Sequence, residues 1–313
     1  MQAVILDMDP GVDDALAIML AAGSPELDIA AITTVSGNVP VATGTSNALK
    51  VLELIGRNDI PVYSGADCPL QRSVVHALEV HGEGGLGESD LPCPTAEAAG
   101  DAVPFLVEEL ARREREVTIV ATGPLTNLAR AEIGHPGILK KARHVVIMGG
   151  ALSVPGNSAP RSEFNFFADP HAARRVVIES GANISLIPLD ATRQVLWSRD
   201  QIQQELTTCP TVSAAFCTEA TKTVIATSRK LYGIDGIYLH DPLAVGTAID
   251  PAICRMEKRR IDVETEGSLT TGMVVEDVRP TLNSERATGV FVNCAVETDT
   301  DGFMRLFLER VLR

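Results

Sequence analysis

Short apolar runs alternate with longer helical segments along most of the chain. Five runs are rich in Val, Ile or Leu and are bounded by turn residues, as buried strands are; they cover residues 4–6, 29–35, 117–121, 144–148 and 184–189. Three segments with helical periodicity, each stopped by a glycine, cover residues 12–22, 41–55 and 170–180. This order predicts an α/β fold with one open, mainly parallel β-sheet and helices on both faces.

The pattern contains no internal repeat and no linker, so we expect a single domain over residues 1–313. One stretch, at about residues 64–95, breaks the alternation because it is rich in Gly, Pro and polar residues. Loops of this length are commonly functional. The stretch is therefore predicted to be a flexible flap over a site.

Composition and charge narrow the classes of partner. Apolar residues make up 45% of the chain, which is enough for a large core. Lys and Arg total 27 against 41 for Asp and Glu, a net charge of −14. Nucleic acids and anionic membranes bind clustered positive charge, so we expect neither as a partner. The charge is compatible with a metal cation and a small neutral substrate.

The sequence also predicts a cytoplasmic location. The N-terminal residues lack the basic region of a signal peptide, and no apolar run is long enough to span a bilayer. The six cysteines are scattered without a C-x-x-C spacing, so we expect reduced thiols rather than a disulfide framework.

Four carboxylates are crowded where the first predicted strand ends: Asp7, Asp9, Asp13 and Asp14. Carboxylates about 4 Å apart repel one another by roughly 4 kcal/mol at an effective dielectric constant near 20. The start of the following helix offsets less than about 1 kcal/mol per charge. A hard cation that prefers oxygen ligands, such as Ca²⁺ or Mg²⁺, would relieve the repulsion. We therefore predict a metal site at this turn.

Polar residues follow several other predicted strands. Asn38 and Thr122 come shortly after the strands at 29–35 and 117–121, and a polar loop with Asn157 and Asn165 follows the strand at 144–148. Open α/β sheets bind ligands beyond the carboxyl ends of their strands, so these loops can converge on one site. The Asp-Pro pairs at residues 169–170 and 250–251 are instead interpreted as helix caps.

Taken together, these motifs resemble one protein family, the calcium-dependent nucleoside hydrolases of the inosine–uridine-preferring type. The family's N-terminal signature is similar to the run Asp7-x-Asp9-Pro10-Gly11-x-Asp13-Asp14-Ala15. Matching motifs follow in the family's order: Thr33-Thr34-Val35-x-Gly37-Asn38, His81-Gly82-x-x-Gly85-Leu86-Gly87, Thr122-Gly123-Pro124-Leu125-Thr126-Asn127, Met148-Gly149-Gly150, Glu163-Phe164-Asn165 and His240-Asp241-Pro242. The resemblance covers residues 5–242 and implies the Rossmann-like fold of that family.

The resemblance also implies the activity and the metal ligands. It implies hydrolysis of the N-glycosidic bond of ribonucleosides to ribose and free base, by a homodimer or homotetramer. The metal would be Ca²⁺, held by the carboxylates of Asp9, Asp14 and Asp241 and the backbone carbonyl of Thr122. Asp13 would be the general base that activates water.

Substrate contacts follow from the same resemblance. The residues implied for the ribose are Asn38, Asn157, Glu163 and Asn165, with Met148 and Phe164 lining the sugar pocket. His240 is implied as the proton donor to the leaving base, with His81 in the flap assisting and Tyr232 near the base. The acid that protonates the leaving base is His240, His81 or neither of them. The preferred substrate is uridine, cytidine or inosine, and the resemblance does not decide among them.

Three other functions remain to be distinguished. Asp7-Met8-Asp9 at a strand end is similar to the D-x-D of haloacid-dehalogenase-like phosphatases, although Pro10-Gly11-x-Asp13-Asp14 is foreign to that chemistry. A non-catalytic ribose- or nucleoside-binding protein would not need Asp13. A domain that Ca²⁺ merely stabilises would not need the polar residues implied for the ribose.

Overall fold

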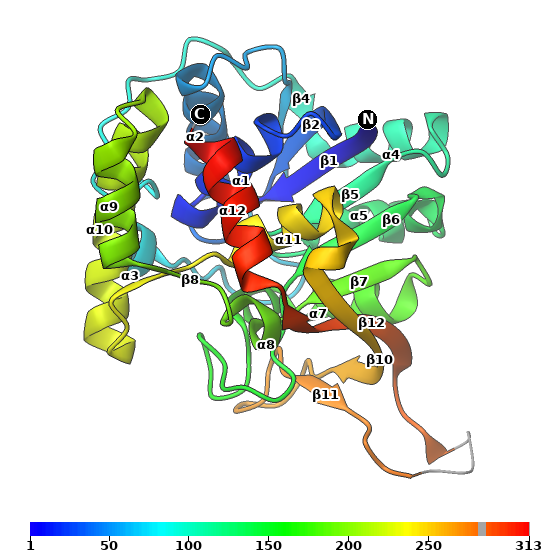
Figure 1. Ribbon diagram of the computed structural model, residues 1–313. Coiled ribbons are helices and arrows are strands. Elements are labelled where there is room, and N and C mark those ends of the chain that lie inside the picture. Colours follow the sequence, from blue (N-terminus) through cyan, green and yellow to red (C-terminus); the bar gives the residue numbers. More distant parts are fainter. Residues whose placement is uncertain (281–285, 313) are drawn as a thin grey trace.

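A sheet of ten strands forms the centre of the computed structural model, which describes residues 1–280 and 286–312 (Figure 1). Its order is β11-β10-β12-β7-β6-β5-β1-β2-β3-β4. Neighbouring strands run parallel from β12 to β4, whereas β10 and β11 are antiparallel additions at one edge. The open, mainly parallel sheet predicted from the sequence is therefore confirmed. The strands are β1 (Gln2–Met8), β2 (Leu27–Thr34), β3 (Val62–Ser64), β4 (Gly100–Asp101), β5 (Thr118–Ala121), β6 (His144–Met148), β7 (Ile184–Ile187), β10 (Cys254–Val263), β11 (Val274–Glu276) and β12 (Val290–Thr298).

Helices cover the sheet, and a two-stranded antiparallel pair, β8 (Leu196–Ser198) with β9 (Gly236–Tyr238), lies apart from it. The helices are α1 (Val12–Ala22), α2 (Val41–Leu54), α3 (Leu78–His81), α4 (Ala102–Arg112), α5 (Thr126–Gly134), α6 (Phe164–Ala168), α7 (Pro170–Arg174), α8 (Leu189–Thr192), α9 (Arg199–Thr208), α10 (Val212–Tyr232), α11 (His240–Ile249) and α12 (Thr300–Val311). Short helical turns are η1 (Ile138–Lys141), η2 (Arg175–Glu179) and η3 (Pro251–Ile253).

The three predicted helices lie where the sequence placed them, but part of one is a π-helical turn and not an α-helix. The helix expected at residues 12–22 is α1 with the same bounds, and that at 41–55 is α2, one residue shorter. The helix expected at residues 170–180 is α7 followed by the π-helical turn η2. Side-chain periodicity does not distinguish these two hydrogen-bonding patterns, so the sequence could not have predicted the change.

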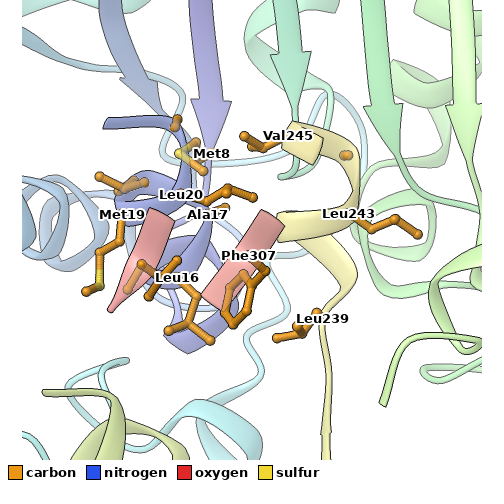
Figure 2. Packing of buried hydrophobic residues seen from close by; sticks show 14 of the residues in the cluster. Met8, Leu16, Ala17, Met19, Leu20, Leu239, Leu243, Val245 and Phe307 are labelled. Carbon is orange, nitrogen blue, oxygen red and sulfur yellow. The ribbon is translucent and has the colours of Figure 1, made fainter. Parts of the chain in front are cut away.

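Strand β1 is buried on both faces, which explains its continuous apolar run. Its alternate residues Val4, Leu6 and Met8 join one hydrophobic cluster, whereas Ala3 and Ile5 join the other. Figure 2 shows how the first cluster joins α1, α11 and α12, through Met8, Leu16, Ala17, Met19, Leu20, Leu239, Leu243, Val245 and Phe307. Packing on both faces therefore fixes the position of β1 and of the acidic turn that follows it.

The strand register brings the loops after the central strands together. In the sheet Asp7 of β1 pairs with Thr33 of β2 and with Ala121 of β5, so these strands end at the same level. Helix α11 packs against α1 and brings Asp241 to the same edge. The convergence of strand ends predicted from the sequence is thus present.

Asp169 and Asp250 cap helices, as predicted. Asp169 Oδ1 accepts a hydrogen bond from the Ala172 amide (3.0 Å), and Asp250 Oδ1 accepts one from Ala252 (2.9 Å). The other oxygen of Asp169 accepts from the Leu70 amide (2.8 Å) and from the Thr126 hydroxyl (2.7 Å), which ties the start of the flap to α5. The flexibility of the flap stays a prediction.

The polypeptide offers no candidate for a membrane span: within the described part of the chain, no helix combines the length and the apolar character that crossing a bilayer demands.

Candidate active site

A cavity of about 430 Å³ lies at the carboxyl edge of the sheet. Most of the residues predicted for the site line it: Asp13, Asn38, His81, Thr122, Met148, Asn157, Glu163, Phe164, Asn165, Tyr232, His240 and Asp241. Asp9 and Asp14 do not line the cavity but are fully buried against these residues. Segments from residue 9 to residue 241 therefore meet at one place, as the sequence predicted.

Carboxylates form the floor of this cavity. Oxygen atoms of Asp13, Asp14 and Asp241 all lie within 4.8 Å of one another. Asp9 adjoins them: its Oδ2 accepts a hydrogen bond from the Asn38 amide (2.7 Å). The other oxygen of Asp9 and Oδ1 of Asp13 are buried without a hydrogen-bond partner among the described residues. Two carboxylate oxygens are thus free to bind a cation.

The electrostatics of the cluster favour such a cation. Burial raises the pKa of Asp9 and of Asp241 well above the ordinary value, and the neighbouring carboxylates raise both further. Burial and the charge of Asp13 raise the pKa of Asp14 to about 6, against hydrogen bonds that favour its ionised form. Several buried carboxylates without a balancing cation are costly. The donors are all oxygen, so the site fits a hard metal ion.

Glycine allows the chain to wrap closely around Asp9. A Cβ atom added to Gly37 would lie only 2.0 Å from Asp9 Oδ2, closer than any real contact. The same loop continues to Asn38, whose backbone amide binds that oxygen. The glycine in this motif therefore allows the loop after β2 to grip the carboxylate.

Thr122 and Asn38 hold the carboxylate of Asp14, and Asn165 holds Thr122. The Thr122 hydroxyl donates to Asp14 Oδ1 (2.9 Å), and Asn38 Nδ2 donates to Asp14 Oδ2 (3.1 Å). The Thr122 carbonyl, implied as a metal ligand by the resemblance, accepts a hydrogen bond from Asn165 Nδ2 (2.6 Å). These bonds hold the carboxylate and the carbonyl in fixed orientations.

Glu163 caps α6 from the opposite wall. Its Oε1 accepts from the Asn165 amide (2.8 Å), and its Oε2 accepts from the amides of Gly150 (3.0 Å) and Phe166 (3.3 Å). Burial raises its pKa to about 7 although these hydrogen bonds oppose the rise. Nearby, Asn157 Oδ1 accepts from the Phe164 amide (2.8 Å). The polar residues of this wall are therefore oriented by backbone amides.

Both histidines are anchored through Nδ1. His81 Nδ1 accepts from the Val12 amide (3.1 Å) and lies 3.9 Å from Asp13 Oδ1. His240 Nδ1 lies 2.7 Å from the Thr192 hydroxyl. Burial lowers the pKa of His81 to about 4 and that of His240 to about 3, so both rings are neutral near pH 7. The Nε2 atom of each ring remains for a ligand.

One side of the cavity was missed by sequence reasoning. It consists of Arg193 after α8, Val224 of α10, and Ile237 and Tyr238 of β9. Tyr232 lines the same cavity, with its side chain half exposed and its hydroxyl donating to the Asn157 carbonyl at 3.4 Å; its place near the base stays a prediction. These residues carry no motif of their own, so no sequence signal could have identified them.

The lining also bears on the phosphatase alternative. Aspartyl phosphotransfer of the haloacid-dehalogenase type needs a lysine beside the acidic turn, and among the described residues that line the cavity none is a lysine. The four acidic side chains around the floor and the asparagines above them suit a metal-bound neutral ligand better.

Comparison with known proteins agrees with this geometry. A sequence model of the family described as inosine-uridine preferring nucleoside hydrolase matches residues 4–305. The chain is 38% identical to the pyrimidine-specific ribonucleoside hydrolase RihA of Citrobacter koseri, over 98% of this chain and 97% of that protein. It is also 38% identical to the inosine-uridine preferring nucleoside hydrolase of Leishmania major, over 99% and 97%. A solved plant nucleoside hydrolase superposes with a TM-score of 0.92 at 34% identity, covering 99% of both chains. The chain belongs to the inosine-uridine preferring nucleoside hydrolase family and is a ribonucleoside N-ribohydrolase.

Proposed function

We propose that this enzyme hydrolyses ribonucleosides with one bound Ca²⁺ and with Asp13 as the general base. The observation that carries the proposal is the unpaired Oδ1 of Asp13, which is buried at the cavity floor within the group of carboxylates that would hold the metal. Asp9, Asp14 and Asp241 would bind the ion through carboxylate oxygens, together with the Thr122 carbonyl. A bound Ca²⁺ would orient water and ribose hydroxyls and lower the pKa of that water.

Asp13 is suited to accept a proton. Burial raises its pKa above the ordinary value for aspartate, which makes the carboxylate a stronger base. The water oxygen bonds to C1′ as the C1′–N bond breaks, and the electron pair of the C1′–N bond passes to the leaving nucleobase. Positive charge develops on the sugar during this step, as in other glycoside hydrolyses. The ionised carboxylates below the cavity would stabilise that charge.

The opposite wall would hold the ribose. Asn38, Asn157, Glu163 and Asn165 line the cavity. The Asn38 side chain is held by Asp14, and the other three side chains are held by backbone groups, so little conformational entropy is lost when a sugar binds. Met148 and Phe164 supply apolar surface beside them. Binding energy at the hydroxyl groups would thereby serve to position C1′ against water.

His240 and Tyr232 would lie near the base. When the Thr192 hydroxyl donates to Nδ1 of His240, the proton of the neutral ring lies on Nε2 and can be donated to the departing base. His81 has the same geometry, with its Nδ1 accepting from the Val12 amide, so it is the second candidate donor. We propose uridine as substrate, with cytidine or inosine as alternatives, in line with the relatives named for pyrimidines and for inosine and uridine.

Asp13→Asn tests the general base. The variant is expected to lose about 10²–10⁴-fold in kcat with little change in KM, because only proton removal is impaired. Asp7→Asn is the matched control: Asp7 is also buried at the end of β1 but does not line the cavity, and its kcat should stay within about threefold. Near-normal turnover by Asp13→Asn would contradict the assignment.

The nucleobase preference and the role of His240 are tested together. kcat/KM is measured for uridine, cytidine, inosine, adenosine and guanosine, with the wild type and with His240→Ala. We expect uridine to be preferred over the two amino-purines and His240→Ala to lose most of kcat on natural nucleosides. A wild-type preference for adenosine or guanosine, or an unaffected His240→Ala enzyme, would defeat this part of the proposal.

Two further proposals concern the enzyme's context. We propose a homodimer or homotetramer by analogy with the family, and a cytoplasmic location because all six cysteines are unpaired, with Cys68 and Cys93 exposed as free thiols. Light scattering that gives about 33 kDa in solution would refute the oligomer, since that is the mass of one chain.

A further inference from the structure

Arg193 lies on the side of the cavity that the family motifs do not reach. It follows the short helix α8 and lines the cavity with a half-buried side chain. Its neighbour Thr192 is the residue that holds the ring of His240. This corner of the chain is therefore next to the residue proposed to meet the departing base.

The guanidinium group is held in place from the opposite wall. Nη1 donates to the Pro155 carbonyl (2.7 Å) and Nη2 to the Gly156 carbonyl (3.1 Å). A guanidinium carries five N–H donors in a fixed plane and no acceptor, so donors remain after these two bonds. Two anchored N–H groups also keep the long side chain from swinging out to solvent.

Arg193 brings a positive charge to the part of the cavity that contains His240. Among the described residues that line the cavity, Arg193 alone carries a permanent positive charge. Arg193 and His240 line the same cavity, and Thr192, the residue before Arg193, contacts the His240 ring. The rest of this side is mostly uncharged, with Val224, Ile237 and Tyr238.

We infer that Arg193 is a specificity-determining residue that selects nucleosides whose base carries a carbonyl oxygen where the competing base carries an amino group. The inference rests on the proposed function, because it requires a ribonucleoside bound with its base toward His240. A donor-only cation attracts the O4 of uracil or the O6 of hypoxanthine. It faces the exocyclic amino group of cytosine or adenine with donor against donor.

The same contact strengthens during the reaction. As the C1′–N bond breaks, its electron pair enters the base and increases the negative charge on the carbonyl oxygen. The base then takes up a proton in place of the lost bond, and water supplies the oxygen that C1′ gains. A fixed cation beside the accumulating charge stabilises the transition state more than the ground state. Arg193 should therefore affect kcat as well as KM for bases with that carbonyl.

Two substrate pairs isolate this effect. Uridine against cytidine and inosine against adenosine each compare a carbonyl with an amino group at one ring position. A fifth substrate, 4-nitrophenyl β-D-ribofuranoside, needs the ribose chemistry but presents no nucleobase. Arg193→Met is expected to lower kcat/KM tenfold or more for uridine and inosine, as loss of a charge-assisted hydrogen bond does. Cytidine, adenosine and the nitrophenyl riboside should change less than threefold.

Arg161→Met is the matched control for anchoring of the loop. Arg161 also donates to two backbone carbonyls of that region, Leu152 (2.6 Å) and Ser153 (3.3 Å), but does not line the cavity. Its variant should keep the uridine-to-cytidine and inosine-to-adenosine ratios of the wild type within threefold. An equal change of those ratios in Arg161→Met would assign the effect to the loop and overturn the inference.

Other outcomes are equally decisive. A uniform loss on all five substrates in Arg193→Met, the nitrophenyl riboside included, would show a structural or ribose-binding role and overturn the inference. Wild-type kcat/KM ratios that favour cytidine and adenosine would overturn it as well. Failure of the wild-type enzyme on every substrate would instead refute the proposed function, so the two failures are distinguishable.

Discussion

Replacing Asp14 with asparagine separates stability from activity at the acidic floor of the cavity. The substitution preserves the shape of the side chain and can preserve its hydrogen bonds. The asparagine oxygen can accept from the Gly11 amide and from Asn38, which now donate to Oδ2 at 3.0 and 3.1 Å. The amide nitrogen can donate to the Thr122 hydroxyl, which rotates to accept. What changes is the charge.

The size of the effect follows from the pKa. Folding raises the pKa of Asp14 from 3.8 to about 6, so near pH 7 the ionised carboxylate costs about 3 kcal/mol in the metal-free protein relative to the unfolded chain. Asparagine removes that cost. With an unfolding entropy of about 2 cal/mol/K per residue, the gain corresponds to a rise in Tm of about 5 °C for a chain of 313 residues.

The pH dependence has a definite sign. Because the folded state binds the Asp14 proton more tightly than the unfolded state, the wild type loses stability as pH rises from about 4 to about 6 and then levels off. The advantage of Asp14→Asn should therefore be near zero below pH 4 and full above pH 6. Thermal unfolding in EDTA at pH 4, 5, 6 and 7 measures it.

With metal bound, the wild type should be more stable than Asp14→Asn. Added Ca²⁺ stabilises the folded wild type by mass action, whereas Asp14→Asn lacks a carboxylate ligand and should gain less and show little activity. A variant no more stable than the wild type in EDTA at pH 7, or an advantage independent of pH, would refute the reasoning that buried like charges destabilise this site.

Three further predictions concern the metal and the loops that hold the site. Elemental analysis of protein purified without added metal should give about one calcium per chain, and stoichiometric zinc would overturn the assignment because the acidic cluster offers only oxygen ligands. Asp169→Ala should destabilise the protein by about 2–4 kcal/mol in urea unfolding, because the buried Thr126 hydroxyl and the Leu70 amide lose their acceptor. Its kcat should stay near normal. An unchanged unfolding midpoint would show that the cap is dispensable. Gly37→Ala should weaken metal binding in calcium titrations, since its Cβ would collide with Asp9 Oδ2, and wild-type affinity would show that the loop can yield.

The sequence predicted the parts of the molecule that local pattern determines. The central strands β1, β5, β6 and β7 are continuous apolar runs because both of their faces are buried, and the acidic turn is a single short segment at the end of β1. The antiparallel edge strand β10 was not predicted, because charged residues such as Arg255, Lys258 and Arg259 interrupt any apolar run in it.

The base side of the cavity was beyond sequence reasoning for a different reason. Val224, Tyr238 and Arg193 come from three separate elements, and each is an ordinary residue in its own segment. Only the packing of α10 and β9 over the sheet edge brings them together. The polar loops on the side proposed to hold the ribose were expected to meet because they follow strand ends, where the fold brings loops together, whereas their role at the ribose came from the family resemblance.

The two ends of the cavity differ in how firmly they are joined to the framework. At the end proposed to hold the ribose, both oxygens of Glu163 accept from backbone amides that start α6, and the same side chain lines the cavity. At the base end, α10 lies with α9 at the periphery of the molecule (Figure 1), and Tyr232 reaches across by one long hydrogen bond to the Asn157 carbonyl. We therefore expect substitutions at the first end to impair folding together with catalysis, and substitutions at the second end to be better tolerated by the fold. Substitutions on this side could therefore change the nucleobase preference while the residues proposed for the ribose stay the same. Directed evolution of new base preferences should begin on α10.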